Sequence, residues 1–125
     1  MVFIITIYIL SEVFYLKKTE MIKGKEYFSR IIKAGNYIKD DNFVIYYVDN
    51  FENKYCHFGI AIKKSIGKAH LRNKLKRQVR MIIHNNKNLF KLSRDYIIMI
   101  RDGCQISTYV EMENSIISLM KGEKK

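Results

Sequence analysis

The stretch KKSIGKAHLRNKLKRQVR, residues 63–80, decides the fold of this chain. It contains eight Lys or Arg, one His and no Asp or Glu, so it supplies +8 of the formal net charge of +11 carried by the 125 residues. From Lys68 onward its apolar residues recur at helical spacing and fall within about 80° of one another on a helical wheel. They are Leu71, Leu75, Val79 and Ile82. We therefore expect a helix that buries one face and carries cations on the other.

The cations of this helix have no acidic residues among them. Arg72, Lys76 and Arg80 form an i,i+4 ladder of like charges, and such pairs destabilise an isolated helix. A helix with a structural role would interleave Glu here, so the ladder indicates an external polyanion, most often a nucleic-acid backbone. Three of the six Arg of the chain lie in residues 72–80, and a guanidinium group can bind phosphate through two parallel hydrogen bonds. The alternative is a solvated basic face.

Residues 59–80, GIAIKKSIGKAHLRNKLKRQVR, resemble the signature of the protein subunit of bacterial ribonuclease P. In that family a strand leads into a V/I-G-x-A loop and then into a helix that opens R-N-R-hydrophobic-K-R. Residues 16–35 resemble the family's first helix and residues 42–50 its first strand, so the resemblance covers roughly residues 16–120. The chain departs from the pattern at Lys74, where Arg is usual, at Ser65, where Lys is common, and at Ile32, where an aromatic residue is frequent.

The resemblance implies an α+β fold, a single-domain α/β sandwich of the order α-β-β-β-α-β-α with a left-handed βαβ crossover, ribosomal-protein-S5-domain-2-like. Periodicity alone predicts α-β-β-α-β-α, with strands over residues 42–48, 55–62 and 96–100 and a last helix over residues 109–121. The alternative is that the first or second of these strands is broken in two. It also places a first helix between about residue 20 and Gly35, which would end it. Cys56 and Cys104 lie 48 residues apart without metal-ligand spacing, so both are expected to be reduced thiols.

The resemblance also implies two RNA-binding surfaces. The first is basic and would bind the catalytic RNA through Lys64, Lys68, Arg72, Asn73, Lys74, Lys76, Arg77 and Arg80. The second is a cleft between the first helix and the sheet, which would hold the single-stranded 5′ leader of precursor tRNA and would be formed by Phe28, Arg30, Ile32, Val44 and Tyr46. Aromatic rings stack on unpaired bases without sequence preference. The alternative role for Phe28 and Tyr46 is core packing.

No catalytic residue and no protein-bound metal are expected. His57, His70 and His84 show no motif spacing and Asp40-Asp41 lie beside few other acids, so neither a general base nor a pair of metal-binding carboxylates is indicated. The resemblance implies that the RNA subunit and its Mg²⁺ ions hydrolyse the substrate. The chain would be the accessory subunit of this endonuclease, with ribonuclease P RNA and precursor tRNA as partners and no small-molecule substrate.

Residues 1–15 form an apolar extension ahead of a ribonuclease P protein domain at residues 16–125. Residues 2–10 are apolar except for one Thr, too short a run to span a bilayer, which takes roughly 20 residues. Three explanations are open: an interfacial or membrane-associated segment, an additional strand, or a wrongly assigned start of translation. Our hypothesis is that Leu16 is the true start.

Two other functions are compatible with the basic helix. One is a general structured-RNA-binding or ribosome-associated protein without a processing role. The other is a membrane-surface protein anchored by residues 1–16, with its Lys clusters on anionic lipid. The first predicts RNA affinity without stimulation of processing, and the second predicts partition into the membrane fraction. We expect a cytoplasmic protein.

Overall fold

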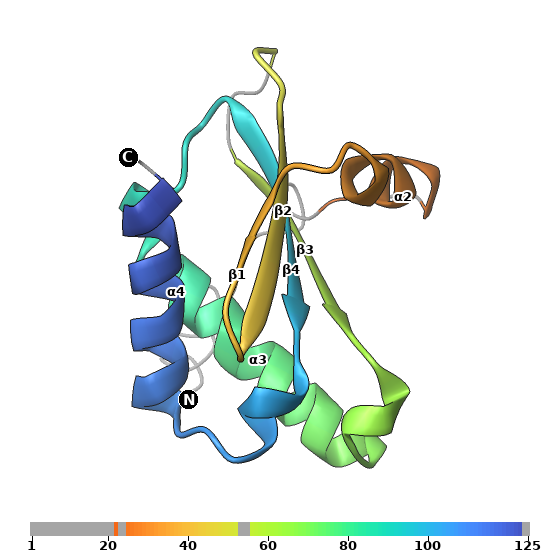
Figure 1. The fold of residues 1–125 in the computed structure, drawn as a ribbon, viewed down its shortest axis with the longest axis vertical. Helices are drawn as coiled ribbons and strands as arrows, with labels where there is room; N and C mark the ends of the chain where they lie inside the picture. Colours follow the sequence, from red (N-terminus) through yellow and green to blue (C-terminus); the bar gives the residue numbers. More distant parts are fainter. Residues whose placement is uncertain (1–21, 23–24, 53–55, 124–125) are drawn as a thin grey trace, which may run out of the picture.

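The structure is a computed structural model that describes residues 22, 25–52 and 56–123. Figure 1 shows its helices and strands. They are, in chain order, α2 (Lys25–Lys33), β1 (Tyr37–Lys39), β2 (Phe43–Asp49), β3 (His57–Ile62), α3 (Ala69–Asn85), β4 (Arg94–Ile100) and α4 (Tyr109–Glu123). Short 3₁₀ turns, η2 (Lys64–Ile66), η3 (Lys87–Leu89) and η4 (Asp102–Gln105), lie between them. The order α-β-β-β-α-β-α implied by the resemblance is confirmed, and the order from periodicity alone was wrong because it lacks β1.

The strands form one four-stranded sheet in the order β1-β2-β4-β3. β1 pairs with β2 and β2 pairs with β4 in antiparallel fashion, whereas β3 and β4 are parallel. The parallel pair is joined through α3, which makes β3-α3-β4 the expected βαβ crossover. Its left-handedness stays an implication of the resemblance. The last strand of the chain therefore lies inside the sheet, between two strands that precede it in the sequence.

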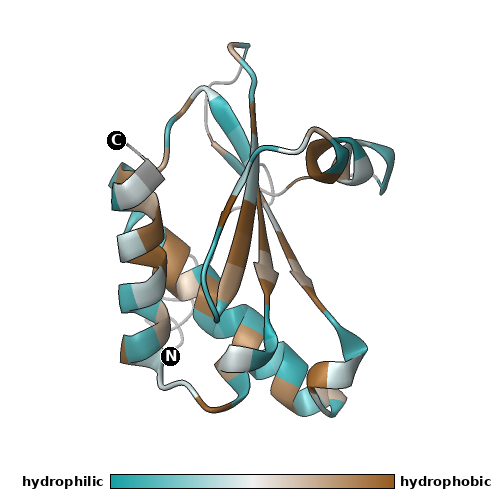
Figure 2. Ribbon diagram, in the orientation of Figure 1, coloured by the Kyte–Doolittle hydropathy of each residue, from teal (hydrophilic) through white to brown (hydrophobic). Residues whose placement is uncertain are grey.

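One face of the sheet is covered by α3 and α4, and the main core lies there. Alternate residues of the strands point into this core, among them Phe43, Ile45, Phe58, Tyr96, Ile98 and Ile100. They meet Leu75, Val79 and Ile82 of α3 and Met112, Ile116 and Met120 of α4. Figure 2 shows the apolar side of α4 turned toward α3 and the sheet. The apolar stripe predicted for the basic helix is thus the part of α3 that the core buries.

The C-terminal ends of α3 and of α2 follow from local sequence. Asn86 stops α3, and its side-chain Nδ2 donates to the Ile82 carbonyl at 2.8 Å. Gly35 follows α2 with a φ of +84°, a backbone conformation that glycine adopts at no steric cost and that commonly ends a helix. The position of Gly35 confirms the predicted end of the first helix.

Two further sequence expectations can be compared with the described residues, and a third cannot. Asp95 was expected to precede its strand, but it lies within β4 and is buried. Cys56 and Cys104 are buried thiols that form no disulfide, in line with the expectation that both are reduced. Residues 1–15 lie outside the described residues, so the hypothesis about Leu16 stays a prediction. Within the described part of the chain, no helix has the length and apolar character needed to cross a membrane.

Candidate nucleic-acid interface

The basic face of α3, defined here as Arg72, Asn73, Lys74, Lys76, Arg77 and Arg80, lies opposite its buried stripe. Asn73, Lys74 and Arg77 are exposed, whereas the other three are half-buried along the edges of the helix. Lys68 is the N-cap residue of α3 and Lys64 begins η2, and both are exposed. The fold therefore gathers all eight residues predicted to bind RNA on one helix and the turn that leads into it.

The positive charges of the basic face have no acidic partner among the described residues. The ion pairs between described residues join His57 to Asp95 and Arg94 to Asp49. Within the basic face, Arg72 donates from Nε to the Gly67 carbonyl at 3.1 Å. This bond orients the guanidinium at the start of α3 and leaves its other nitrogens available for a phosphate.

The face of the sheet opposite α3 and α4, called here the open face, is crossed by three rows of residues. The strand register defines these rows as His57–Asp95–Val48, Gly59–Ile97–Tyr46 and Ala61–Met99–Val44, in that order along β4. α2 packs against β2 and β4 over the first two rows, and it buries Ile97 together with its own Ile31. The third row is only half-buried, because α2 does not extend over it.

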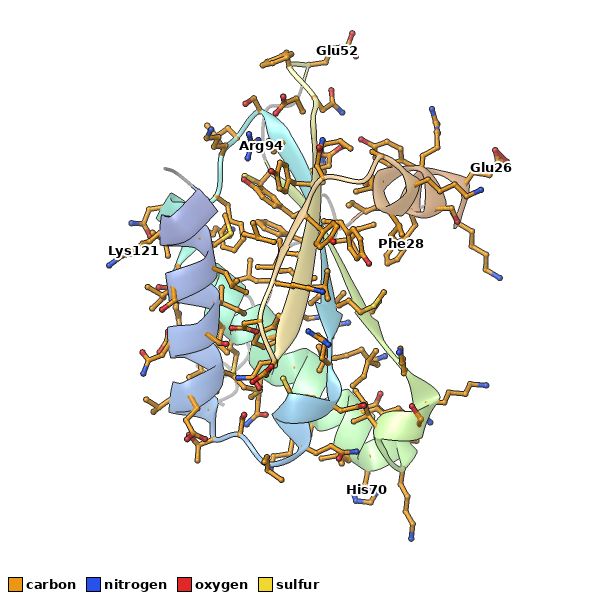
Figure 3. All side chains as sticks on the ribbon, viewed as in Figure 1. Glu26, Phe28, Glu52, His70, Arg94 and Lys121 are labelled. Atoms are coloured by element: carbon orange, nitrogen blue, oxygen red, sulfur yellow. The ribbon has the colours of Figure 1, made fainter. Side chains whose placement is uncertain are left out.

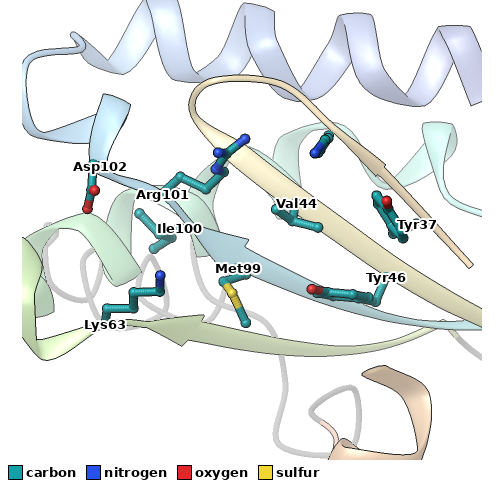
Figure 4. Close-up of a pocket in the computed structure, with 9 residues that line it drawn as sticks. Tyr37, Val44, Tyr46, Lys63, Met99, Ile100, Arg101 and Asp102 are labelled. Atoms are coloured by element: carbon teal, nitrogen blue, oxygen red, sulfur yellow. The ribbon is translucent and has the colours of Figure 1, made fainter. Parts of the chain in front are cut away.

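The uncovered part of the open face is a cleft of about 430 Å³. Its lining consists of Tyr37, Lys39, Val44, Tyr46, Lys63, Met99, Ile100, Arg101 and Asp102. Figure 4 shows the rings of Tyr37 and Tyr46 toward one end and Lys63 and Arg101 toward the other. The two tyrosine rings lie 5.9 Å apart at an angle of 50°. The cleft thus has an aromatic end, an apolar floor and a cationic end.

Backbone and side-chain contacts hold the cationic end in place. Arg101 donates from Nη1 to the carbonyl of Asp40, and its backbone N–H donates to the carbonyl of Asn42 at 2.8 Å. Gln105 of η4 donates from Nε2 to the carbonyl of Ile66 in η2. Because η2 leads directly into α3, the cationic end of the cleft adjoins the start of the basic face.

Two of the five predicted cleft residues line the cleft, and the three that belong to α2, Phe28, Arg30 and Ile32, do not. Val44 and Tyr46 line the cleft. Phe28 lies beneath α2 against Gly59 (Figure 3), and Ile32 follows it one turn later on the same side of the helix. Arg30 does not reach the cleft: it is two positions from Phe28, on the other side of α2, with its guanidinium 5.5 Å from the ring center of Tyr27.

Seven cleft residues were not predicted from the sequence, namely Tyr37, Lys39, Lys63, Met99, Ile100, Arg101 and Asp102. A sequence signal existed for two of them, since Lys63 opens the basic stretch and Arg101 directly follows the apolar run 96–100. The others meet only through the register of β1, β2 and β4, which no local pattern specifies.

Comparison with known proteins identifies the family. The family model described as Ribonuclease P matches residues 16–123. The chain belongs to the ribonuclease P protein family. This confirms the predicted resemblance, and with it the main functional prediction, a subunit of the tRNA-processing endoribonuclease. The family assignment implies an RNA partner for this chain.

Relatives of known name and structure agree with this assignment. A ribonuclease P protein component of Mycoplasma mycoides subsp. mycoides is 39% identical over 107 residues, which cover 85% of this chain and 97% of the relative. A mutant of the Staphylococcus aureus ribonuclease P protein has a structure that matches with a TM-score of 0.80 and 31% identity, covering 94% of this chain and 97% of the other. For the Thermotoga maritima ribonuclease P protein the TM-score is 0.74 and the identity 28%, over 82% of this chain and 96% of the other.

Proposed function

We propose that the chain holds the single-stranded 5′ leader of precursor tRNA in the cleft while the basic face of α3 binds ribonuclease P RNA. The observation that carries this proposal is the junction at η2, where the cationic end of the cleft adjoins the start of α3. A leader lying in the cleft would thereby enter or leave it beside the bound catalytic RNA. We place this complex in the cytoplasm.

The cleft has the chemistry of a site for unpaired RNA. The rings of Tyr37 and Tyr46 can stack on unstacked bases, with typical gains of roughly 1–3 kcal/mol per base and little sequence preference. Lys63 and Arg101 at the opposite end can pair with phosphates. The apolar floor formed by Val44 and Met99 between them excludes water without selecting a base.

The basic face has the chemistry of a site for an RNA backbone. Each cation that contacts a phosphate releases condensed counterions, so binding weakens steeply as the salt concentration rises. Lys74, which replaces the usual Arg of the family motif, keeps the charge but offers no fork of N–H donors. Phosphate contacts there would be single rather than bidentate.

Mg²⁺ is proposed to be held by the RNA subunit and not by this chain. Among the described residues, no group of three or more His, Cys, Asp or Glu could hold a metal ion. The protein's own contribution is electrostatic and positional: its cations lower the repulsion between two RNA molecules, and the cleft fixes the leader beside the site of cleavage.

Cleavage of precursor tRNA by the cognate ribonuclease P RNA at low Mg²⁺ concentration tests the proposal. The chain is expected to stimulate cleavage at the mature 5′ end, more strongly for a substrate with a leader of several nucleotides than for one with a single nucleotide. A folded chain that binds the RNA but does not stimulate cleavage would instead be a general RNA-binding protein, and the proposal would be wrong.

A further inference from the structure

A buried carboxylate joins α2 to the sheet. Asp95 lies in the first row of the open face, on the central strand β4, and is only 1% exposed. Its Oδ2 accepts hydrogen bonds from the Tyr27 hydroxyl and, at 3.2 Å, from Asn50 Nδ2. Its Oδ1 lies 3.0 Å from His57 Nδ1. These three groups come from α2, from the segment after β2 and from β3, so one side chain connects three elements.

We propose that the hydrogen bond from Tyr27 to Asp95 positions α2 over the open face and thereby sets how far α2 extends toward the leader cleft. This inference rests on the proposed function of the cleft. Tyr27 and Asp95 are positioning residues in this proposal, because neither lines the cleft. They act on the leader through the position of α2, whose Phe28 lies against Gly59 in the row next to the cleft floor.

α2 needs such a contact because it is short. A nine-residue helix is marginal on its own, so tertiary contacts decide where it lies. Its apolar contacts, through Ile31 and Phe28, favour burial but allow small shifts along the sheet, since hydrophobic attraction is not directional. A hydrogen bond to a buried carboxylate is directional, and a shift that broke it would leave a charged acceptor less satisfied inside the protein.

The order of the rows on the open face links the position of this hydrogen bond to the distance between α2 and the cleft floor. Tyr27 is bonded in the first row, and the next residue, Phe28, lies against Gly59 in the second row. The third row, which includes Met99, is the cleft floor. A displacement of Tyr27 along β4 therefore moves Phe28 toward or away from the floor by a similar amount.

The phenol of Tyr27 can donate a hydrogen bond throughout the neutral pH range. Burial raises the pKa of the Tyr27 phenol above its ordinary value, and the hydrogen bond and negative charge of Asp95 raise it further. The phenol thus stays protonated at neutral pH and can always donate. When the Tyr27 hydroxyl is removed, Asp95 keeps Asn50 and His57 as partners. The buried carboxylate is then still hydrogen-bonded.

The test compares Tyr27→Phe with the matched variant Tyr109→Phe in the holoenzyme assembled with its cognate RNA. Tyr109 lies in α4 on the other side of the sheet, and its half-buried hydroxyl is hydrogen-bonded to Asn85. Affinity is measured for two precursor tRNAs, one with a leader of several nucleotides and one with a single-nucleotide leader. Tyr27→Phe is expected to lose about five- to tenfold in affinity for the long leader only, and Tyr109→Phe to change neither affinity.

Hydrogen exchange gives an independent readout of α2. Backbone amides of residues 31–33 are expected to exchange faster in Tyr27→Phe than in the unaltered chain, and at an unchanged rate in Tyr109→Phe. Asp95→Asn should show the same selective loss for the long leader, to a larger degree. Unchanged exchange in α2, or equal losses for both leaders, would overturn the positioning role while leaving the cleft proposal in place. If the unaltered holoenzyme itself does not distinguish the two leaders, the cleft proposal fails and this inference fails with it.

Discussion

The ring of Phe28 lies against the backbone of Gly59 so closely that a Cβ added to Gly59 would stand 2.7 Å from the ring carbon Cε2. Glycine at this position lets α2 approach β3. Gly59→Ala should push the ring and α2 away from the sheet, lower the free energy of unfolding by about 1–3 kcal/mol and weaken binding of a long leader. Urea denaturation and leader binding measure the two effects.

Gly122→Ala is the control for this variant, because a Cβ at Gly122 meets nothing within 4 Å. In α4 it should be neutral or stabilising by up to about 1 kcal/mol, since Ala favours a helix over Gly. A Gly59→Ala protein as stable as the unaltered chain, with unchanged leader affinity, would show that Phe28 can move without consequence.

The double variant Arg72→Ala with Arg77→Ala tests the basic face. Removing two phosphate contacts should reduce affinity for ribonuclease P RNA and lower the slope of log K against log salt by about 1–2 units. The fold should persist, because Arg77 is exposed and Arg72 contributes one hydrogen bond to Gly67. Circular dichroism and a salt series measure both.

A double variant of exposed lysines outside the basic face, Lys91→Ala with Lys121→Ala, removes the same charge. It should leave the salt slope nearly unchanged. Equal slopes for the two double variants would mean that total charge, and not the face of α3, determines RNA affinity.

Arg101→Ala and Lys63→Ala test the cationic end of the cleft. Each should weaken binding of a long-leader substrate by about three- to tenfold, the effect of losing one charge-assisted phosphate contact, and leave the single-nucleotide leader unaffected. Equilibrium binding with both substrates measures the difference. Uniform losses for both leaders would place these cations on the body of the tRNA or on the catalytic RNA instead.

The thiol of Cys104 should be inert. Burial, followed by the negative charge of Asp40, raises the pKa of Cys104 from 9.0 to about 12. Since the folded pKa is raised, the protonated thiol stabilises the fold below pH 9, and this contribution is lost as the pH rises from about 9 to 12. Cys56 is also buried, and its Sγ donates to the Lys91 carbonyl at 2.6 Å. At pH 8 a disulfide reagent should label neither thiol in the folded chain and both in denaturant, and rapid labelling of the folded chain would contradict the burial of these thiols.

The sequence predicts α3 and its two faces well because a period of 3.6 residues is repeated over 17 residues. It predicts β2 from side chains that alternate strictly between the two faces of a strand. β1 escapes prediction because three residues contain no period, and its role becomes visible only when it pairs with β2. Asp95 was assigned to the segment before a strand because the apolar run begins at Tyr96. A buried acid is rare, and the partners Tyr27, Asn50 and His57, all distant in sequence, make its burial tolerable.

The site is less predictable than the fold for the same reason. Val44 and Tyr46 could be assigned to one face of a strand from alternation, but their neighbours across the sheet depend on long-range register. Lys63 and Arg101 lie in segments whose proximity depends on the parallel pairing of β3 with β4. Arg30 was assigned to the cleft through the resemblance, while its helical position two residues after Phe28 places it on the other side of α2.

The central place of β4 governs the order in which this protein can be made and folded. Among the described strands β3 pairs only with β4, and β4 also supplies the second neighbour of β2, yet β4 ends only at residue 100. During synthesis, β1, β2, β3 and α3 leave the ribosome before the strand that unites them, and such non-local pairing slows folding. Neither the cleft floor nor the apolar support of α3 is complete until then. The nascent chain therefore acquires its two RNA-binding surfaces together, in one late step, and not one after the other.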